Sequence, residues 1–304
     1  MSSKIVDIVI PTYRPGDEFQ ELISRLKKQD YPVRAIYVVN TETGVFPKEF
    51  CEENEIKVVH ISKSEFDHGG TRDMMMRRSD AEIVVFMTQD AMPANSQLIS
   101  KLVSGFSEDL TGAVYARQLP KEDCSIIEKY TRKFNYPESS VVKSQEDIQK
   151  MGIKTFFCSN VCAAYRRDVY EKMGGFERHT IFNEDMILAG KMVLSGYKIR
   201  YEADARVIHS HNYSGRQQFH RNFDLAVSQA EHPEVFDGIK SESEGIRLVK
   251  QTAAYLLKIK KPWLIVRLVY QSGCKYLGYK LGYHYKSLPN WLIHICTMNR
   301  EYWK

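Results

Sequence analysis

Residues 81–93 read AEIVVFMTQDAMP, an apolar run that passes directly into polar side chains. Its β-branched and aromatic content predicts a buried strand, because short runs of this kind fill the interior of parallel sheets. Asp90 follows the apolar part. It is therefore expected at the carboxyl end of the strand, where open α/β sheets bind ligands.

Three more strand signals precede this stretch, at residues 5–11, 35–40 and 56–61. Between the first two strands, residues 16–29 place apolar side chains at helical spacing, which predicts a helix. After the third strand, residues 71–79 predict another helix. The β-α-β-α-β order predicts an α/β fold with a mostly parallel central sheet flanked by helices. The strand ends, where function is expected, include Thr12, Tyr13, Asn40 and Asp90.

The remaining chain is less regular. Residues 118–150 are polar and weakly periodic, which predicts a long binding loop or lid. A buried strand within 155–167, a helix from Glu184 and strand signals before residue 210 follow. Near residue 230 the composition changes to a linker and then to a basic helical region. We therefore expect a catalytic domain over 1–230 and a helical extension over 231–304.

Length and composition narrow the class of protein. The chain has 304 residues, of which 43% are hydrophobic and 27% charged, as in ordinary globular proteins, so disordered and fibrous classes are excluded. No apolar run reaches the roughly 18 residues of a membrane span. The N-terminus has no signal-peptide pattern, and six cysteines without a C-x-x-C pair suit a reducing compartment, so a cytoplasmic location is expected.

The charge is unevenly distributed. Residues 250–304 contain ten basic residues and one acid, whereas the formal charge of the whole chain is only +5. The same tail contains ten Tyr and Trp residues. This composition favours contact with an anionic membrane surface, with nucleic acid and a solvated, packing or dimer-forming helical face as alternatives.

Four groups of residues offer chemistry. Asp90 is either a metal ligand or a loop acid. In DHGGTR (67–72), the glycines permit close backbone approach and Arg72 suits a phosphate, although Gly-Gly is common in loops. Glu184 and Asp185 are either helix-dipole partners or a general base with its neighbour. His209 and His211 alternate along a strand and suit a metal, a phosphate or a core hydrogen bond.

In sequence order, VIPTYRPGD, HGGTR, TQDAMP, GGF…NED and the H-x-H pair resemble family 2 glycosyltransferases, which have the GT-A fold. The resemblance covers about residues 5–225. FDHGGTR with TQDAMP looks most like bacterial rhamnosyltransferases, which use dTDP-L-rhamnose to build O-antigens or cell-wall rhamnans.

The resemblance implies a role for each matching position. It implies Asp185 as catalytic base, Glu184 as the residue that orients the acceptor, and Asp90 with His209 or His211 as ligands of Mn²⁺ or Mg²⁺. Thr88 replaces the first acid of the family's D-x-D motif, and Asn40 stands where an acid is commoner. The implied donor-binding residues are Thr12, Tyr13, Arg14, Asn40, Asp67, Gly70, Arg72, Gln89 and Asp90.

The expected activity is therefore metal-dependent, inverting transfer of L-rhamnose to a hydroxyl of a lipid-linked glycan at the inner membrane face. One alternative is the same mechanism with UDP-glucose or UDP-galactose. An alternative of another class is a catalytically silent module that binds glycan or protein. The acidic body of the chain and the lack of a groove-reading motif argue against nucleic-acid binding.

Overall fold

The computed structural model describes residues 3–239 and 242–303. Its chain forms two compact units. The first unit consists of Met1–Leu119, Tyr136–His179 and Glu184–His209, and the second of Pro120–Asn135, Thr180–Asn183 and Ser210–Lys304. The division of roles between 1–230 and 231–304 remains a prediction, because a compact unit and a catalytic domain need not share a boundary.

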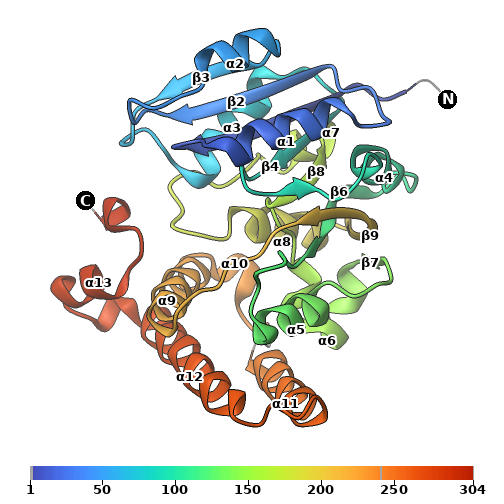
Figure 1. The fold of residues 1–304 in the computed structure, drawn as a ribbon. Coiled ribbons are helices and arrows are strands. Elements are labelled where there is room, and N and C mark those ends of the chain that lie inside the picture. Colours follow the sequence, from blue (N-terminus) through green and yellow to red (C-terminus); the bar gives the residue numbers. More distant parts are fainter. Residues whose placement is uncertain (1–2, 240–241, 304) are drawn as a thin grey trace. The chain divides into compact units, whose positions relative to one another are not determined.

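The first unit is built on one mixed sheet (Figure 1). Its strands are β1 (Val6–Tyr13), β2 (Ala35–Thr41), β3 (Lys57–Ile61), β4 (Ile83–Met87), β5 (Met92–Pro93), β6 (Thr111–Leu119), β7 (Val141–Lys143), β8 (Cys162–Arg166) and β9 (Lys198–Ile208). The strand order is β3-β2-β1-β4-β8-β6-β9-β5, with β7 beside β9. The first four neighbours are parallel, as are β6 and β9, and β8 runs antiparallel between β4 and β6.

Helices cover the sheet of the first unit. They are α1 (Asp17–Lys27), α2 (Lys48–Glu53), α3 (His68–Arg78), α4 (Leu98–Ser104), α6 (Ile148–Met151), α7 (Arg167–Lys172) and α8 (Glu184–Leu194), with 3₁₀ turns at Gln145–Asp147 and Gly152–Phe156. Because side chains alternate along a strand, Val85 joins a core with Phe19 and Leu22 of α1, whereas Phe86 packs edge-on against Tyr165 and Phe176. The predicted α/β class is confirmed.

The parallel strands bring the predicted functional positions to one edge. Thr12 pairs in register with Asn40, and Asn40 pairs with His60 of β3. Further along the sheet, Met92 of β5 pairs with Ile208 of β9. This pairing fixes the turn that contains Asp90 beside the residues that follow β9.

The prediction of a long loop over 118–150 is wrong. Residues 118 and 119 complete β6, and the stretch then contains α5 (Ile126–Asn135), β7 and two short helical segments. Within this polar stretch Ile126, Ile127, Tyr130 and Phe134 recur at helical spacing, although Ile127 is the one buried residue of α5. Ile127 packs with Leu256 and Leu268 inside the second unit.

The second unit is helical. Besides α5 it contains α9 (Gly215–Glu231), α10 (Pro233–Phe236), α11 (Glu242–Lys258), α12 (Leu264–Tyr283) and α13 (Asn290–Cys296), with 3₁₀ turns at Tyr285–Ser287 and Arg300–Trp303 (Figure 1). A β-carbon at Gly278 or Gly282 would collide with the α9 backbone at Phe219 or Phe223. These two glycines therefore let α12 lie directly against α9, as small residues spaced by four do in other helix pairs.

The predicted linker near residue 230 contains α10, whose Val235 and Phe236 are buried, and Lys240 and Ser241 lie outside the described residues. Cys158 and Cys162 are both buried, and burial raises the pKa of both thiols. Within residues 3–239 and 242–303, no helix combines the length and apolar character needed to cross a bilayer.

Candidate active site

Asp90 and His209 come together in the first unit. Asp90 lies in a turn after β4, which is closed by the hydrogen bond from Ala91 N to the Thr88 carbonyl at 3.1 Å. His209 follows β9 directly, and its Nε2 lies 3.4 Å from Asp90 Oδ2. The carboxylate is partly exposed, whereas the imidazole is buried. An oxygen and a nitrogen at this separation can share a cation bound about 2.1 Å from each.

Gln118 orients the imidazole of His209. The Oε1 atom of Gln118, near the end of β6, lies 3.2 Å from His209 Nδ1. Because an amide oxygen can only accept, Nδ1 is the donor in this hydrogen bond, and Nε2 is the ring nitrogen that a cation beside Asp90 would use. Gln118 was not among the predicted site residues, because residue 118 falls in the stretch expected to be a loop; its position at the carboxyl end of a strand is the signal that could have found it.

The donor set fits a divalent cation. Among the described residues, Asp90, His209 and His211 form a group that could hold a metal ion, with one ligand atom from each. The carboxylate oxygen of Asp90 suits Mn²⁺ or Mg²⁺, and the imidazole nitrogens suit a transition-metal ion such as Mn²⁺ better than Mg²⁺, which prefers oxygen ligands. The buried hydroxyl of Thr88, which stands in place of an acid, has no hydrogen-bond partner within the described ranges.

Glu184 is buried at the start of α8 and is held by two partners. Arg72 Nη1 lies 3.2 Å from its Oε1, and the Asn160 side-chain amide donates to the same oxygen at 3.1 Å. Burial alone would raise the pKa of Glu184. The charges of Arg72 and His68 and the Asn160 hydrogen bond outweigh that effect and lower the pKa, so Glu184 is ionised at neutral pH.

Asp185 is partly exposed and differs from its neighbour in protonation. Its Oδ2 accepts from the backbone N–H of Asn160 at 2.9 Å, and its Oδ1 from that of Met186 at 2.8 Å. Desolvation by the surrounding protein, followed by the charge of Glu184, raises the pKa of Asp185 to about 7. Asp185 can therefore accept or release a proton near neutral pH, as a general base must.

The ends of β1 and β2 carry the predicted nucleotide side of the site. The Thr12 hydroxyl lies 3.2 Å from Asn40 Oδ1, and Asn40 Nδ2 lies 3.2 Å from His60 Nδ1. His60, which was not predicted as a site residue, belongs to this row by strand register. Such a row of polar groups at strand ends can hydrogen-bond a ribose or a base.

Tyr13 and Gln89 connect the ends of β1 and β4. The Gln89 amide accepts from the Tyr13 backbone N–H at 2.9 Å and donates to the Tyr13 carbonyl at 3.0 Å. The neighbouring Arg14 has a left-handed backbone (φ 50°), and its guanidinium lies 5.3 Å from the centre of the Tyr13 ring. The exposed Tyr13 ring is thereby presented at this edge of the sheet.

The DHGGTR stretch forms the start of α3. Asp67 caps the helix by accepting from Gly70 N, a role that favours Asp and does not need a ligand. A β-carbon at Gly69 would collide with the Glu177 carbonyl, so the close approach expected of this glycine is to protein backbone. Arg72 is thereby brought to Glu184, and its buried Nε has no partner among the residues described.

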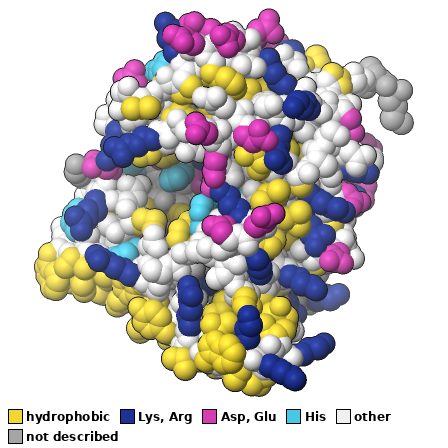
Figure 2. All heavy atoms as spheres, in the orientation of Figure 1, with side chains coloured by type: hydrophobic (Ala, Val, Ile, Leu, Met, Phe, Trp, Pro, Cys, Tyr) yellow, Lys and Arg dark blue, Asp and Glu magenta, His cyan; other side chains and the backbone are white. Residues whose placement is uncertain are grey.

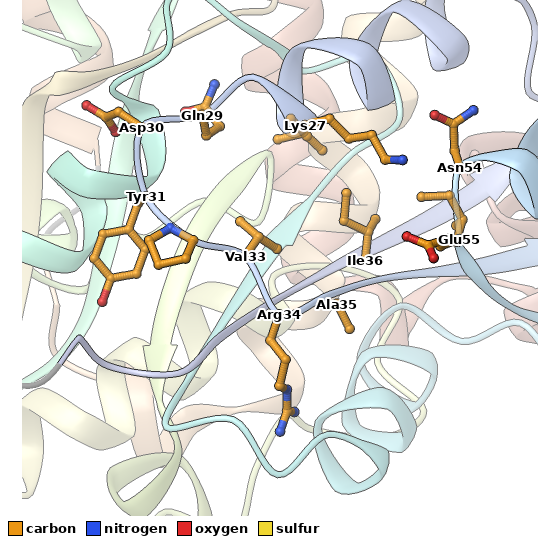
Figure 3. A pocket seen from close by; sticks show the side chains of 13 residues that line it. Lys27, Gln29, Asp30, Tyr31, Val33, Arg34, Ala35, Ile36, Asn54 and Glu55 are labelled. Carbon is orange, nitrogen blue, oxygen red and sulfur yellow. The ribbon is translucent and has the colours of Figure 1, made fainter.

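One cavity, of about 320 Å³, lies away from these residues (Figure 3). It is lined by the end of α1 and by residues that begin β2 and β3, including Ala35 and Ile56. This is the amino edge of the parallel strands, opposite the edge where Asp90 lies. The Arg34 side chain at the rim of the cavity is bound by Asp7 and Asp80. Because the cavity lies at the opposite edge of the sheet, it does not contribute to the candidate site.

Comparison with known proteins agrees with this geometry. Residues 7–174 match the model of the family described as glycosyl transferase family 2. The chain is 41% identical to the O-antigen chain rhamnosyltransferase RfbN of Salmonella typhimurium, over 98% of this chain and 96% of the relative. It is 38% identical to the O-antigen chain rhamnosyltransferase WbaN of Salmonella anatum, over 97% and 95%.

Solved structures share the fold at lower identity. A mannosyltransferase from Pyrobaculum calidifontis, in complex with GDP-Man and Mn²⁺, superposes with a TM-score of 0.60 at 17% identity, over 89% of this chain and 74% of the other. Staphylococcus aureus TarS (residues 1–349) with UDP gives 0.56 at 16% identity, over 93% and 91%. The chain thus has the GT-A fold, is a glycosyltransferase, and belongs to glycosyl transferase family 2.

Proposed function

We propose that this enzyme transfers L-rhamnose from dTDP-L-rhamnose to a hydroxyl of a lipid-linked glycan during O-antigen synthesis, with inversion at the anomeric carbon. The names of the two Salmonella relatives support the sugar and the polysaccharide. The observation that carries the mechanism is the pair Glu184 and Asp185: Arg72 lies 3.2 Å from Glu184 and lowers the pKa of that carboxyl, whereas desolvation raises the pKa of Asp185.

Asp185 acts as the base in this proposal. An acceptor hydroxyl has a pKa far above 7, so it attacks the sugar carbon well only if its proton is removed during attack. The partly exposed Asp185 carboxylate takes that proton while the carbon–oxygen bond to the diphosphate breaks on the opposite face. Glu184, which remains ionised, accepts a hydrogen bond from the acceptor and so orients it.

Asp90, His209 and His211 hold Mn²⁺ or Mg²⁺ in this proposal. When bound, the cation neutralises charge on the departing diphosphate. Asp90 supplies the anionic ligand, and Gln118 keeps the His209 nitrogen available to the cation. Thr88 cannot supply a second carboxylate, so we infer a weaker metal site than a D-x-D motif would give.

The donor lies along the strand ends. Thr12, Tyr13, Arg14 and Asn40 contact the base and ribose, and Gln89 fixes the Tyr13 backbone beside them. Asp67 and Gly70 act by shaping the start of α3. Arg72 directs to the diphosphate its Nε, which has no hydrogen-bond partner among the described residues, while its Nη1 stays with Glu184.

The alternative enzyme activities differ in the sugar nucleotide that serves as donor. Structural neighbours with the same fold are named in complex with GDP-Man or UDP-GlcNAc, so the fold does not select dTDP-L-rhamnose. UDP-glucose or UDP-galactose is therefore the competing donor. A catalytically silent module is disfavoured because Asp90, His209 and Asp185 are all present.

The second unit provides a surface for the membrane that carries the acceptor. One face of α12 exposes Val266, Val269, Tyr270, Tyr276, Leu277 and Tyr283, and Trp263 precedes it. Lys and Arg side chains lie among these apolar groups over α11 and α12 (Figure 2). Aromatic and aliphatic side chains mixed with cations suit an anionic lipid surface, and we propose that the enzyme works there, on the cytoplasmic side.

Calorimetry with three donors tests the proposed substrate. We expect dTDP-L-rhamnose to bind with Mn²⁺ and to bind much more weakly with EDTA, while UDP-glucose and GDP-mannose bind poorly in both. Asp90→Ala should bind dTDP-L-rhamnose equally weakly with and without Mn²⁺. A preference for another nucleotide would discard the rhamnose assignment, and unchanged affinity in Asp90→Ala would discard Asp90 as a metal ligand.

Asp185→Asn tests the base. We expect donor affinity to be retained and turnover to fall about 10²–10⁴-fold, the usual contribution of general-base catalysis. Because the base works deprotonated, wild-type kcat should fall as pH drops below about 7, and this limb should disappear in the variant. Glu171→Gln, which removes an exposed acid, is the control. Near-wild-type turnover of Asp185→Asn would refute the role.

Vesicle binding tests the α12 surface. Trp263 is 65% exposed and Val266 76%, and Trp291 on α13 is a matched control at 64%. We expect Trp263→Ala/Val266→Ser to bind phosphatidylglycerol vesicles at least about tenfold more weakly, since each lost apolar side chain removes about 1.5–3 kcal/mol. Trp291→Ala should bind like wild type. Equal binding by all three forms would assign the exposed face to another contact, such as a homodimer.

A further inference from the structure

Residues Ser159 and Asn160 lie in the tight connection before β8 and face the candidate site with both side chains. The connection is closed by a hydrogen bond from Cys162 N to the Ser159 carbonyl at 3.1 Å. Asn160 is buried, and Ser159 is partly buried. Neither residue is a metal ligand or an acid–base group, yet each hydrogen-bonds a side chain that serves the site.

Ser159 continues the row that begins at His209. Gln118 Nε2 donates to Ser159 Oγ at 3.0 Å, while Gln118 Oε1 lies 3.2 Å from His209 Nδ1. The Ser159 oxygen thus accepts a hydrogen bond from the Gln118 amide N–H₂. This contact keeps the Gln118 amide oxygen directed at the His209 imidazole. If the Gln118 amide flipped, its N–H₂ would face Nδ1, which would favour a proton on Nε2 and occupy the lone pair that faces Asp90.

Asn160 fixes this row to the base-bearing helix α8. Its backbone N–H donates to Asp185 and its side-chain N–H₂ to Glu184. Its Oδ1 accepts from the Tyr165 hydroxyl at 2.9 Å, which sets the orientation of the amide. Asn160 therefore has its backbone donor and both ends of its side chain engaged, and the adjacent Ser159 is held in place by the same anchoring.

We propose that Gln118 and Ser159 are positioning residues that hold His209 in the tautomer with Nδ1 protonated, with Asn160 fixing Ser159 to the Glu184–Asp185 end of α8. The inference rests on the proposed function in that it gives His209 a cation to bind. The orientation of the imidazole itself follows from the hydrogen bonds alone. Outer hydrogen bonds of this kind commonly change metal affinity about 10–100-fold.

Three variants distinguish an effect on the position of His209 from an effect on the folding stability of the protein. Gln118→Leu keeps the approximate size of the side chain but removes the acceptor for His209 Nδ1. Gln118→Glu restores an acceptor, and the Ser159 hydroxyl can then donate to it. Ser159→Ala removes only the oxygen that orients Gln118. Thermal unfolding without metal provides the check that each variant is folded.

The first readout is the affinity for Mn²⁺ in the absence of donor. It is measured from the electron paramagnetic resonance signal of the free ion. We expect Gln118→Leu to weaken Mn²⁺ binding about 10–100-fold, Ser159→Ala to weaken it to a lesser degree, and Gln118→Glu to bind like wild type or more tightly. A purely structural role would affect Gln118→Glu as much as Gln118→Leu. Equal affinity in wild type and Gln118→Leu would overturn the inference.

The second readout needs no metal. In protein labelled with ¹⁵N-histidine, kept metal-free at a pH where His209 is neutral and carrying Asp90→Asn so that no carboxylate attracts a proton to Nε2, we expect the form with Gln118 to show the Nδ1–H tautomer. Adding Gln118→Leu should shift His209 toward the Nε2–H form. An unchanged tautomer would overturn the inference even if Mn²⁺ binds. Failure of wild type to bind Mn²⁺, together with this shift, would refute the proposed metal site and leave the positioning role standing.

Discussion

Two carboxylates at adjacent positions cannot both be ionised freely in a poorly solvated site, and the candidate active site depends on how this conflict is resolved. Arg72 contacts Glu184 at 3.2 Å, so Glu184 holds the charge and Asp185 holds the proton until about neutral pH. The ion pair requires α3 to lie close to the segment before α8. Gly69 permits that approach because any side chain there would strike the Glu177 backbone.

Much of this could be predicted from the sequence because parallel strands end at a common edge. Thr12, Asn40 and Asp90 each follow a recognisable apolar run, so a correct strand assignment was sufficient to place them together. Asp90 and His209 are far apart in the chain; the alternation of His209 and His211 along a strand suggests a ligand, and the order of motifs shared with the family links His209 to Asp90. The structure then places the two side chains 3.4 Å apart.

The supporting residues could not be predicted in the same way. Gln118, Asn160 and His60 have no distinctive neighbours in sequence, and their roles arise from strand register and from contacts across the sheet. The Gly-Gly pair predicts close approach of a ligand, which stays a prediction for Gly70, whereas Gly69 is required by its contact with the Glu177 backbone and has the same sequence signature. The loop expected over 118–150 is wrong because the helical spacing of Ile126, Ile127, Tyr130 and Phe134 lies within a long polar stretch, and Ile127 finds its buried partners at distant Leu256 and Leu268.

The central claim is that Asp185 is the carboxyl that changes protonation near neutral pH. Its titration can be followed directly by the ¹³C resonance of its side-chain carboxyl group in wild type and in Glu184→Gln. We expect a pKa of about 7 for Asp185 in the wild type and a lower value in Glu184→Gln, because the neighbouring charge is removed. A wild-type Asp185 that titrates near the ordinary aspartate value of about 4 would contradict the account.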